Sequence, residues 1–381
     1  MEMQFIYADN AATTKMSDVA VKAMLPYLQE TYANASSVHI LGQRSAAALF
    51  SARQQLAQLL HCAPKELFFT SGGSEADNQA LISAAAIGRQ QGKRHIISTA
   101  MEHHAILHTL EALEEQGFTV TLLRPQKDGI VTAAQVAAAL TDETCLISVM
   151  YANNETGAIQ PIREIGALCR QRGVLFHTDA VQAAGHVDID VQRDNIDMLS
   201  LSAHKFHGPK GVGLLFAKSS IQLTSLIRGG GQERGKRAGT ENLPGIVGLA
   251  AAFKDAQEQL APNTAYITNL RDALRAGLEQ IPGASFNGSR EHCLPGTVNY
   301  SFQGVNGEAL LSLLANAGIC CSSGSACSAG SLEPSHVLLA LGLSSEMAQS
   351  ALRFSLCAYN TIDEVQTIIN KVADAVKHLR R

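Results

Sequence analysis

Short apolar runs alternate with longer amphipathic stretches across residues 67–217. Runs of this length are typical of buried strands, and the stretches between them have helical periodicity. After the run that ends at Thr70, the predicted strands are His95–Ser98, Thr119–Leu123, Cys145–Tyr151, Val174–His177, Met198–Ser202 and Gly213–Ala217. The helices predicted between them include Ala105–Gln116, Thr132–Ala139 and Pro161–Arg172. This alternation predicts an α/β fold with a mostly parallel sheet covered by helices on both faces.

The two ends of the chain depart from this alternation. Helical patterns at Val19–Tyr32 and Arg44–Leu60 precede it, and a long helical stretch, Ile246–Gln280, follows it. The composition shifts inside that stretch, near Gln257–Thr264. The patterns beyond it suggest a smaller α+β unit, with elements at Thr297–Phe302, Glu308–Ala317 and Thr361–Leu379. A chain of 381 residues is long enough for two domains.

One lysine stands between two of the apolar runs. The segment Ser202–Gly211, SAHKFHGPKG, follows the run Ile196–Leu201 and precedes the run Val212–Ala217. A lysine just beyond a buried strand can be desolvated, which lowers its pKa and makes its amine a nucleophile toward carbonyl groups. A surface lysine in a hairpin is the ordinary alternative for Lys205, and the motifs around it decide against that alternative.

Two further motifs also follow predicted strands. Asp179 comes after the apolar run Val174–Phe176, at the end of a strand where α/β proteins bind ligands. The stretch Leu67–Glu75, LFFTSGGSE, runs through glycines into a helical pattern, and free N–H groups at a helix N-terminus suit a phosphate. A nucleophilic lysine, an acid and a phosphate cradle are what pyridoxal 5′-phosphate (PLP) requires, because its aldehyde binds a lysine and its ring nitrogen pairs with a carboxylate.

A series of motifs along the chain resembles that of the cysteine desulfurases, in the NifS- and IscS-like branch of the class V PLP-dependent aminotransferase superfamily. The motifs are TSGGSEADN, MEHHA, ANNETG, TDAVQ, SAHKFHGPKG, RAGTEN and SSGSACSAGSLEPSHVL. The resemblance runs from YADNAATT at residues 7–14 to RFSL at residues 353–356, which is nearly the whole chain.

The resemblance implies the fold type of aspartate aminotransferase (PLP fold type I), with a seven-stranded mixed, mainly parallel sheet in a large domain and a smaller α+β domain. We expect a large PLP-binding domain at residues 14–258. A small domain would comprise residues 1–13 and 259–381 and would carry a catalytic cysteine loop at residues 322–335.

The resemblance also suggests the residues that bind and use the cofactor. Lys205 would hold PLP as a Schiff base and, once freed, would be the base for the Cα proton of the substrate. Asp179 would pair with the ring nitrogen, with the capping of a helix near Ala180 as its alternative role. His103 would stack on the ring and act as acid–base at the substrate thiol, although the adjacent His104 leaves that register open.

The remaining contacts follow from the same resemblance. Gly73 and Ser74 would hold the phosphate, with added contacts from Ser202 and His204. Thr240 of RAGTEN would reach the phosphate of a neighbouring subunit, which makes a homodimer the expected active unit. The ring's oxygen side is assigned to Asn154 and Gln182. The substrate carboxylate is assigned to Asn154 and Arg353, whose guanidinium matches a carboxylate in bidentate fashion.

The stretch Ser322–Ser331 consists of small residues around Cys327 and is typical of a loop. A linker with an incidental cysteine is the alternative. The resemblance makes Cys327 the sulfur acceptor, whose thiolate attacks the sulfur of L-cysteine to give L-alanine and a Cys327 persulfide. Cys327 would also be a transient iron–sulfur ligand by resemblance. We expect no resident metal, because the eight cysteines include no C-x-x-C pair.

Composition bears on partners and location. Hydrophobic residues make up 46% of the chain and charged residues 17%, as in compact soluble proteins. The net charge of −4, with scattered Lys and Arg, gives no case for nucleic-acid binding. The N-terminal MEMQFIYADNAATT lacks the features of a signal peptide, and no apolar run approaches the roughly 18 residues that span a bilayer. We therefore expect a cytoplasmic protein that does not bind membranes.

Alternatives to a cysteine desulfurase stay open at this point. One is a selenocysteine lyase or another class V PLP enzyme, although an aminotransferase has no need of Cys327. The other is a non-catalytic scaffold of iron–sulfur assembly, which the presence of Lys205 and Asp179 disfavours. The expected partners are L-cysteine and a sulfur acceptor, either an iron–sulfur scaffold protein or a component of another thiolation route.

Overall fold

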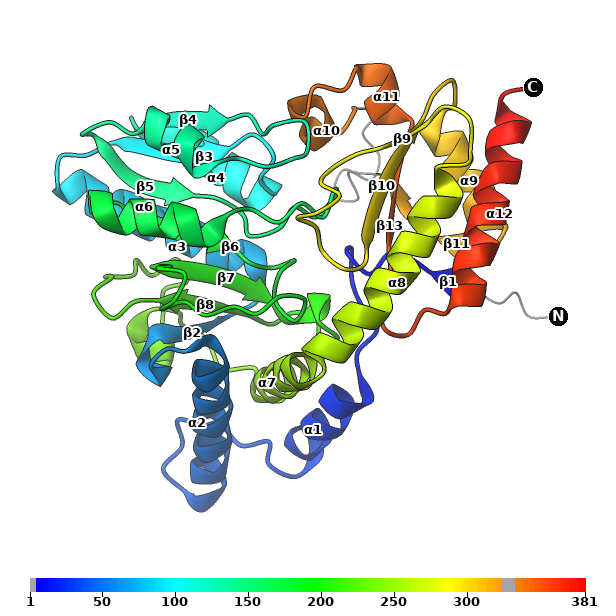
Figure 1. Ribbon diagram of the computed structural model, residues 1–381. Coiled ribbons are helices and arrows are strands. Elements are labelled where there is room, and N and C mark those ends of the chain that lie inside the picture. The colour runs from blue at the N-terminus through cyan, green and yellow to red at the C-terminus, as the bar shows by residue number, and fades with distance from the viewer. Residues whose placement is uncertain (1–4, 324–332) are drawn as a thin grey trace.

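The computed structural model describes residues 5–323 and 333–381. Its largest element is a seven-stranded sheet in the order β2–β8–β7–β6–β5–β3–β4 (Figure 1). Neighbouring strands are parallel except at β8, which runs antiparallel to both β2 and β7. The strands are β2 (Leu67–Thr70), β3 (His95–Thr99), β4 (Thr119–Leu123), β5 (Thr144–Ser148), β6 (Leu175–Asp179), β7 (Met198–Ser202) and β8 (Gly213–Ala217). The predicted mixed, mainly parallel sheet is confirmed.

Helices cover both faces of this sheet because successive residues of each strand point to opposite sides. Ile96 and Leu146 pack with α3 (Gly73–Gln90) and α4 (His104–Glu114) on one face. Their neighbours Ile97 and Ile147 pack into the core on the other face. That second face is covered by α2 (Ile40–Leu60), α5 (Ala133–Ala139), α6 (Ile162–Arg172) and α7 (Leu243–Glu258). Burial on both faces explains why the inner strands are mostly apolar.

A separate hydrophobic core lies in the C-terminal part of the chain. It contains a four-stranded sheet in the order β12–β13–β10–β9 and a two-stranded sheet of β1 and β11. The strands are β1 (Ile6–Tyr7), β9 (Ala284–Phe286), β10 (Thr297–Phe302), β11 (Ile319–Cys320), β12 (Ser322–Ser323) and β13 (Ala351–Ser355). The helices of this core are α8 (Leu260–Leu278), α9 (Gly307–Asn316) and α12 (Ile362–Leu379). Two short helices, α10 (His336–Ala340) and α11 (Ser345–Gln349), contribute to a smaller cluster of their own.

The N-terminus belongs to this second core. Strand β1 pairs in parallel with β11, and Asp9 forms a bridge with Ser355 at the end of β13. The chain then crosses to α1 (Asp18–Gln29), which lies against α7 at the lower edge of Figure 1. The domain boundaries given above remain a prediction.

The predicted helical stretch Ile246–Gln280 consists of two successive helices in the structure. Helix α7 ends at Glu258 and α8 begins at Leu260. The residue between them, Gln259, has φ −95° and ψ 5°, which departs from α-helical geometry. Helix α7 packs in the core of the large sheet and α8 in the second core, so the break lies where the chain passes between the two cores.

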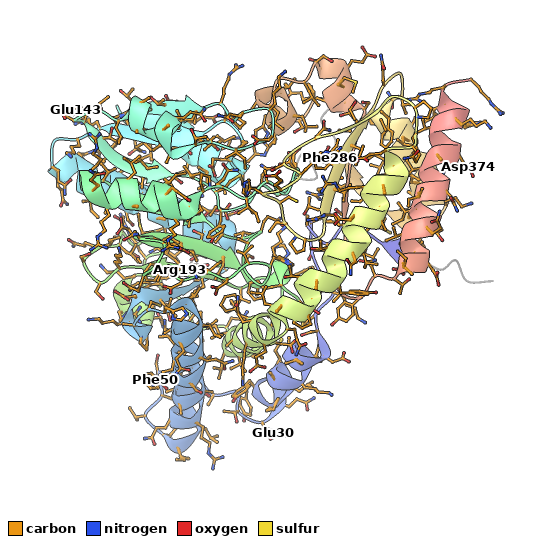
Figure 2. The ribbon with its side chains drawn as sticks, in the orientation of Figure 1. Glu30, Phe50, Glu143, Arg193, Phe286 and Asp374 are labelled. Carbon is orange, nitrogen blue, oxygen red and sulfur yellow. The ribbon has the colours of Figure 1, made fainter. Side chains whose placement is uncertain are left out.

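Three short 3₁₀ turns complete the described elements: Pro64–Glu66, Ala203–Lys205 and Gln232–Gly235. Within residues 5–323 and 333–381, every helix is too short or too polar to cross a bilayer. Side chains of the second core are visible in Figure 2, where Phe286 on β9 lies beside α8. The guanidinium of Arg275 on that helix lies 4.4 Å from the centre of the Phe286 ring.

Candidate active site

Lys205 lies in the 3₁₀ turn that directly follows β7, which is the predicted position just beyond a buried strand. Its half-buried Nζ donates hydrogen bonds to the carbonyl oxygens of Ala11 and Ala12, at 2.6 and 2.8 Å. The same Ala11 carbonyl accepts a hydrogen bond of 2.9 Å from Gln182 Nε2. The segment that leads out of β1 therefore crosses over the lysine and holds its amine in a fixed direction.

Asp179 ends β6, the strand next to β7 in the sheet. One of its carboxylate oxygens accepts a hydrogen bond of 2.9 Å from the backbone N–H of Val181. Burial raises the pKa of Asp179 to about 6, while the Val181 N–H and the charge of Lys205 act in the opposite direction. The neighbouring carboxyl ends of β6 and β7 thus bring the predicted acid and the predicted lysine into electrostatic contact.

The N-terminus of α3 has the shape of a phosphate cradle. The helix begins at Gly73, and the residue before it, Gly72, contributes no side-chain cap. A Cβ atom at Gly73 would lie 2.6 Å from Val181 Cγ2 and 3.7 Å from Ser202 Cβ, so glycine is the residue that fits. The helix therefore begins beside the carboxyl ends of β6 and β7. Its free backbone N–H groups and the exposed Ser74 are available there to bind a phosphate.

His103 caps α4, with its Nδ1 accepting a hydrogen bond of 3.1 Å from the backbone N–H of Ala105. Burial lowers the pKa of His103 to about 4, and the charge of Lys205 contributes to that decrease. The imidazole is therefore neutral near neutral pH. A cavity of about 460 Å³ lies beside it, and its lining includes Ser74 and His104. The ring of His104 stacks on His108, with centroids 5.0 Å apart, and the assignment of His103 to the cofactor ring remains a prediction.

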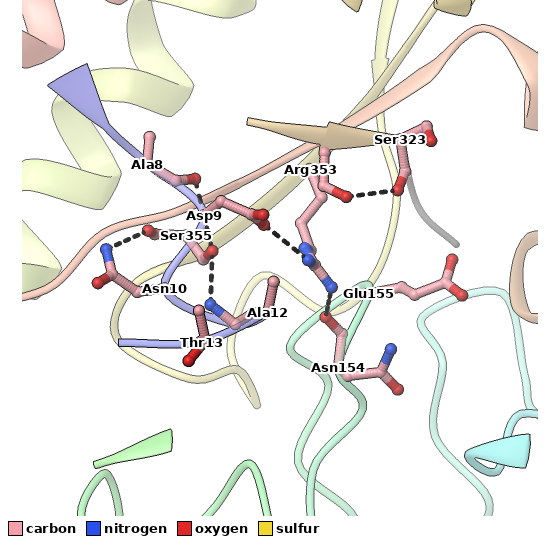
Figure 3. Close-up of polar contacts among 12 residues, drawn as sticks. Ala8, Asp9, Asn10, Ala12, Thr13, Asn154, Glu155, Ser323, Arg353 and Ser355 are labelled. Carbon is pink, nitrogen blue, oxygen red and sulfur yellow. Dashed lines mark hydrogen bonds and ion pairs between the residues drawn. The ribbon is translucent and has the colours of Figure 1, made fainter. Parts of the chain in front are cut away.

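Arg353 on β13 is the most completely buried arginine among the residues described, with 1% of its side chain exposed. Its guanidinium forms an ion pair of 2.8 Å with Asp9 and donates a hydrogen bond of 2.8 Å to the carbonyl oxygen of Asn154 (Figure 3). Its Nε–H has no acceptor among the described residues. A guanidinium held from two sides, with donor capacity left over, is suited to binding a carboxylate.

Two predicted phosphate ligands are less directly placed. His204 Nδ1 lies 3.1 Å from Thr13 Oγ1, so its described contact is with the N-terminal segment. Thr240 is exposed on the surface of this chain. Its loop is fixed to the core by a bidentate pair between Glu233 and Arg53, both buried. Their roles toward phosphate remain predictions.

Cys327 lies outside the described residues, but both flanks of its segment are described. On one side, Ser322 on β12 is the antiparallel partner of Arg353. On the other side, the Ser335 hydroxyl donates a hydrogen bond of 2.5 Å to Glu155, the residue after Asn154. Glu155 is completely buried, and burial raises its pKa to about 7. One flank therefore contacts Arg353 directly, and the other contacts Glu155, which is next to the Asn154 that binds Arg353.

Several residues of this site were not predicted from the sequence. Asp9 and Glu155 lie inside the motifs YADNAATT and ANNETG, yet the motifs gave them no role. The Asp9–Arg353 pair joins residues 344 positions apart in the chain. The only signal for it in the sequence was an acidic residue in one motif and an arginine in another.

Comparison with known proteins identifies the family. The family model for aminotransferase class-V matches residues 6–368. Cysteine desulfurase IscS of Clostridium botulinum is 48% identical over 378 residues, which cover 98% of this chain and 95% of that relative. A putative cysteine desulfurase, IscS 1, of Bacillus subtilis is 46% identical over 380 residues, which cover 99% of this chain and 100% of that protein.

Solved structures agree with the sequence relatives. A NifS-like protein superposes with a TM-score of 0.93 at 37% identity, covering 99% of this chain and 100% of that chain. The chain of SspA in complex with cysteine superposes with a TM-score of 0.82 at 38% identity, covering 93% and 99% respectively. The chain is thus a class-V aminotransferase-type, PLP-dependent enzyme of fold type I. Within that class it belongs to the cysteine desulfurase family.

The residues present fit PLP. The glycine at the start of α3 leaves room for a phosphate that a side chain would fill, and Asp179 is a buried carboxyl next to it. The amine of Lys205 lies at the end of the adjacent strand. These three groups are the ones that the phosphate, the ring nitrogen and the aldehyde of PLP need.

Arg353→Lys tests the carboxylate subsite. The lysine keeps the positive charge but lacks the bidentate fork, so we expect KM for L-cysteine to rise about tenfold or more. PLP binding should stay unchanged, as measured by cofactor titration. Arg290→Lys is the matched control, because Arg290 pairs with Glu279 while 59% of its side chain is exposed. An equal effect of the two substitutions would contradict a substrate role for Arg353.

Proposed function

We propose that this enzyme converts L-cysteine to L-alanine and transfers the sulfur to Cys327 as a persulfide. One observation carries the proposal. The chain has a PLP-type site, defined by Lys205 and Asp179, and a buried arginine, Arg353, that lies beside the flanks of the Cys327 segment.

Each described residue has a distinct part in this reaction. When bound, PLP supplies an electron sink for the negative charge that develops at the substrate Cα. Arg353 binds the substrate carboxylate and so orients the Cα–H bond. Lys205, directed by the Ala11 and Ala12 carbonyls, takes the Cα proton once its amine is free. Asp179 pairs with the ring nitrogen.

The sulfur step balances without an external oxidant. The Cys327 thiolate attacks the substrate sulfur, so one S–S bond forms while the substrate Cβ–S bond breaks. The former Cβ takes up a proton and Cα regains the proton that it lost, so the products are L-alanine and the persulfide. His103 is neutral near neutral pH, so in this proposal it exchanges a proton at the substrate sulfur. The thiolate of Cys327 is then the nucleophile.

We infer that the active unit is a homodimer. Large apolar side chains are exposed along α1 and α2, among them Leu25 at 46%, Leu28 at 57% and Phe50 at 56%. Phe50 projects outward from α2 in Figure 2. A second copy covering this surface would remove it from water and could present Thr240 to its partner's phosphate site. An active monomer in analytical ultracentrifugation would overturn this arrangement.

The proposal also includes the setting and the acceptor. We place the reaction in the cytoplasm, where thiols stay reduced, and the seven cysteines among the described residues are all free. The persulfide sulfur would pass to an iron–sulfur scaffold protein or to another thiolation acceptor.

The proposed function is tested by supplying the holoenzyme with L-cysteine and a thiol reductant and measuring alanine and sulfide. Equal amounts of the two products are expected, because each turnover leaves one persulfide that the reductant cleaves. Mass spectrometry before reduction should find one additional sulfur on the protein. A cofactor-loaded protein that releases no alanine would refute the proposal.

A further inference from the structure

A buried polar cluster lies behind Asp179, on the side of the sheet covered by α3. Its members are Asp77 on α3, His177 on β6 and Ser200 on β7. Asp77 has 1% of its surface exposed, while His177 and Ser200 have none. Ser200 on β7 is paired with Asp179 on β6, so the cluster adjoins the carboxyl that is predicted to pair with the cofactor.

Hydrogen bonds join most of this cluster into a chain. His177 Nδ1 lies 2.9 Å from Ser148 Oγ, and His177 Nε2 lies 3.0 Å from Ser200 Oγ. The Ser200 hydroxyl also faces the Asp77 carboxyl and acts on its electrostatics. The Oδ1 atom of Asp77 is 3.7 Å from His177 Nε2, which is beyond hydrogen-bond distance, and it has no partner among the described residues.

The charges that face Asp77 do not favour a carboxylate there. Asp179 and Glu102 are acidic, and their negative charges would repel it. The nearest base is His177, but burial lowers its pKa to about 3, so it is neutral. The charge of Lys205 acts on Asp179 and is absent from the influences on Asp77. An ionised Asp77 would be a buried anion with one hydroxyl donor and no cation.

We propose that Asp77 is a positioning residue that remains protonated at neutral pH and so leaves the negative charge of the buried pair on Asp179. The inference rests on the PLP site described above. Of two neighbouring buried carboxyls, the one that faces a cation is the one that ionises, and Asp179 is under the charge of Lys205 and would pair with the ring nitrogen of PLP. The neutral Asp77 then donates its proton to Ser200, Ser200 donates to His177 Nε2, and His177 Nδ1–H donates to Ser148. This order gives an acceptor to the polar hydrogens of Asp77, Ser200 and His177.

Infrared spectroscopy of the wild-type holoprotein tests the protonation state directly. Isotopic labelling of aspartate shifts the bands of Asp carboxyls and leaves those of Glu102 unshifted. We expect a carboxylic-acid carbonyl band of aspartate at pH about 7.5, well above the usual pKa of this side chain. The band should be missing in Asp77→Asn. If the wild-type spectrum contains no such band, Asp77 is ionised and the inference is wrong.

Asp77→Asn is also the variant that imitates the proposed state, because it is neutral and has the same shape. We expect it to bind PLP with a Kd within about threefold of the wild-type value and with an unchanged visible spectrum. Asp179→Asn is the contrasting variant and should weaken PLP binding about tenfold or more. A tenfold loss in Asp77→Asn would show that a negative charge at residue 77 is used, which contradicts the proposal.

The pH dependence of melting gives a second measurement on the same protein. Burial and the neighbouring carboxyls raise the pKa of Asp77 in the folded state. Its contribution to stability is therefore complete below the unfolded pKa of about 4 and decreases as pH rises. Asp77→Asn should raise Tm at pH about 7.5 by roughly 2 °C or more, and this difference should vanish near pH 4. A gain that is equal at both pH values would contradict a protonated Asp77.

These tests do not depend on turnover. Failure of the alanine assay would refute the desulfurase proposal but would leave the infrared band and the PLP titration unaffected. A missing aspartate band would refute the role of Asp77 while leaving alanine release intact.

Discussion

Lys205→Ala is expected to bind PLP only reversibly and to lose alanine release by a factor of about 10³ or more. The substitution removes both the amine that would bind the cofactor aldehyde and the base for the Cα proton. Reduction with borohydride followed by denaturation should leave the cofactor mass on the wild-type peptide that contains Lys205 and on no peptide of the variant. Mass spectrometry of the digested protein measures both.

The fold around residue 205 should survive this substitution. The N-terminal segment is held there independently, because Thr14 Oγ1 donates a hydrogen bond to the His204 carbonyl and accepts one from the His207 N–H, at 3.0 and 2.8 Å. Lys210→Ala is the matched control, since this exposed lysine follows in the same segment. Covalent cofactor retained by the Lys205→Ala protein would assign the Schiff base to a different lysine.

The sheet was predictable from the sequence because most of its strands are buried on both faces. Such strands are mostly apolar, and the predicted bounds of Met198–Ser202 and Gly213–Ala217 are those of β7 and β8. The predicted bounds Thr119–Leu123 are those of β4, a partly exposed edge strand. The strand ends then placed Asp179 and Lys205 at neighbouring positions. Adjacent parallel strands end at the same edge of a sheet, so this part of the site follows from local patterns.

The other half of the site depends on contacts that no local pattern contains. Ala11 and Ala12 direct Lys205 through backbone carbonyls, 194 and 193 residues away along the chain. The side chain of alanine carries no functional group, so the sequence gives no indication of this role. The ion pair between Asp9 and Arg353 likewise requires that β1 and β13 meet in the second core, which only the folded chain shows.

Asp77 illustrates a different limit. In the sequence it is a polar residue early in a helical pattern, where a solvated side chain is the ordinary expectation. The helix instead turns this residue toward the sheet, above β6 and β7, and buries it. Its proton therefore becomes part of the electrostatics of the cofactor site, a property set by tertiary packing and not by helical periodicity.

Cys327→Ser is expected to keep PLP binding and L-cysteine binding at wild-type levels while alanine release in the presence of reductant falls by about 10² or more. Serine lacks the polarisable thiolate that attacks sulfur, whereas the groups that bind cofactor and substrate are unchanged. The flanks of this segment meet Arg353 and Glu155, so L-cysteine bound at the arginine, as proposed, would lie where the segment begins and ends. Cofactor titration, alanine release and the mass of the protein after incubation with L-cysteine measure these effects.

Cys321→Ser supplies the control, because Cys321 is a thiol close to the same segment. Burial raises the pKa of Cys321 to about 12, so it is protonated at neutral pH and is a poor nucleophile. We expect this variant to release alanine and to form the persulfide as the wild type does. If mass spectrometry places the additional sulfur on Cys320 or Cys321, Cys327 is not the acceptor. If the Cys327→Ser protein releases alanine at the wild-type rate, the sulfur leaves the substrate without passing through this thiol, and the reaction is a PLP-dependent lyase reaction instead of a transfer to the enzyme.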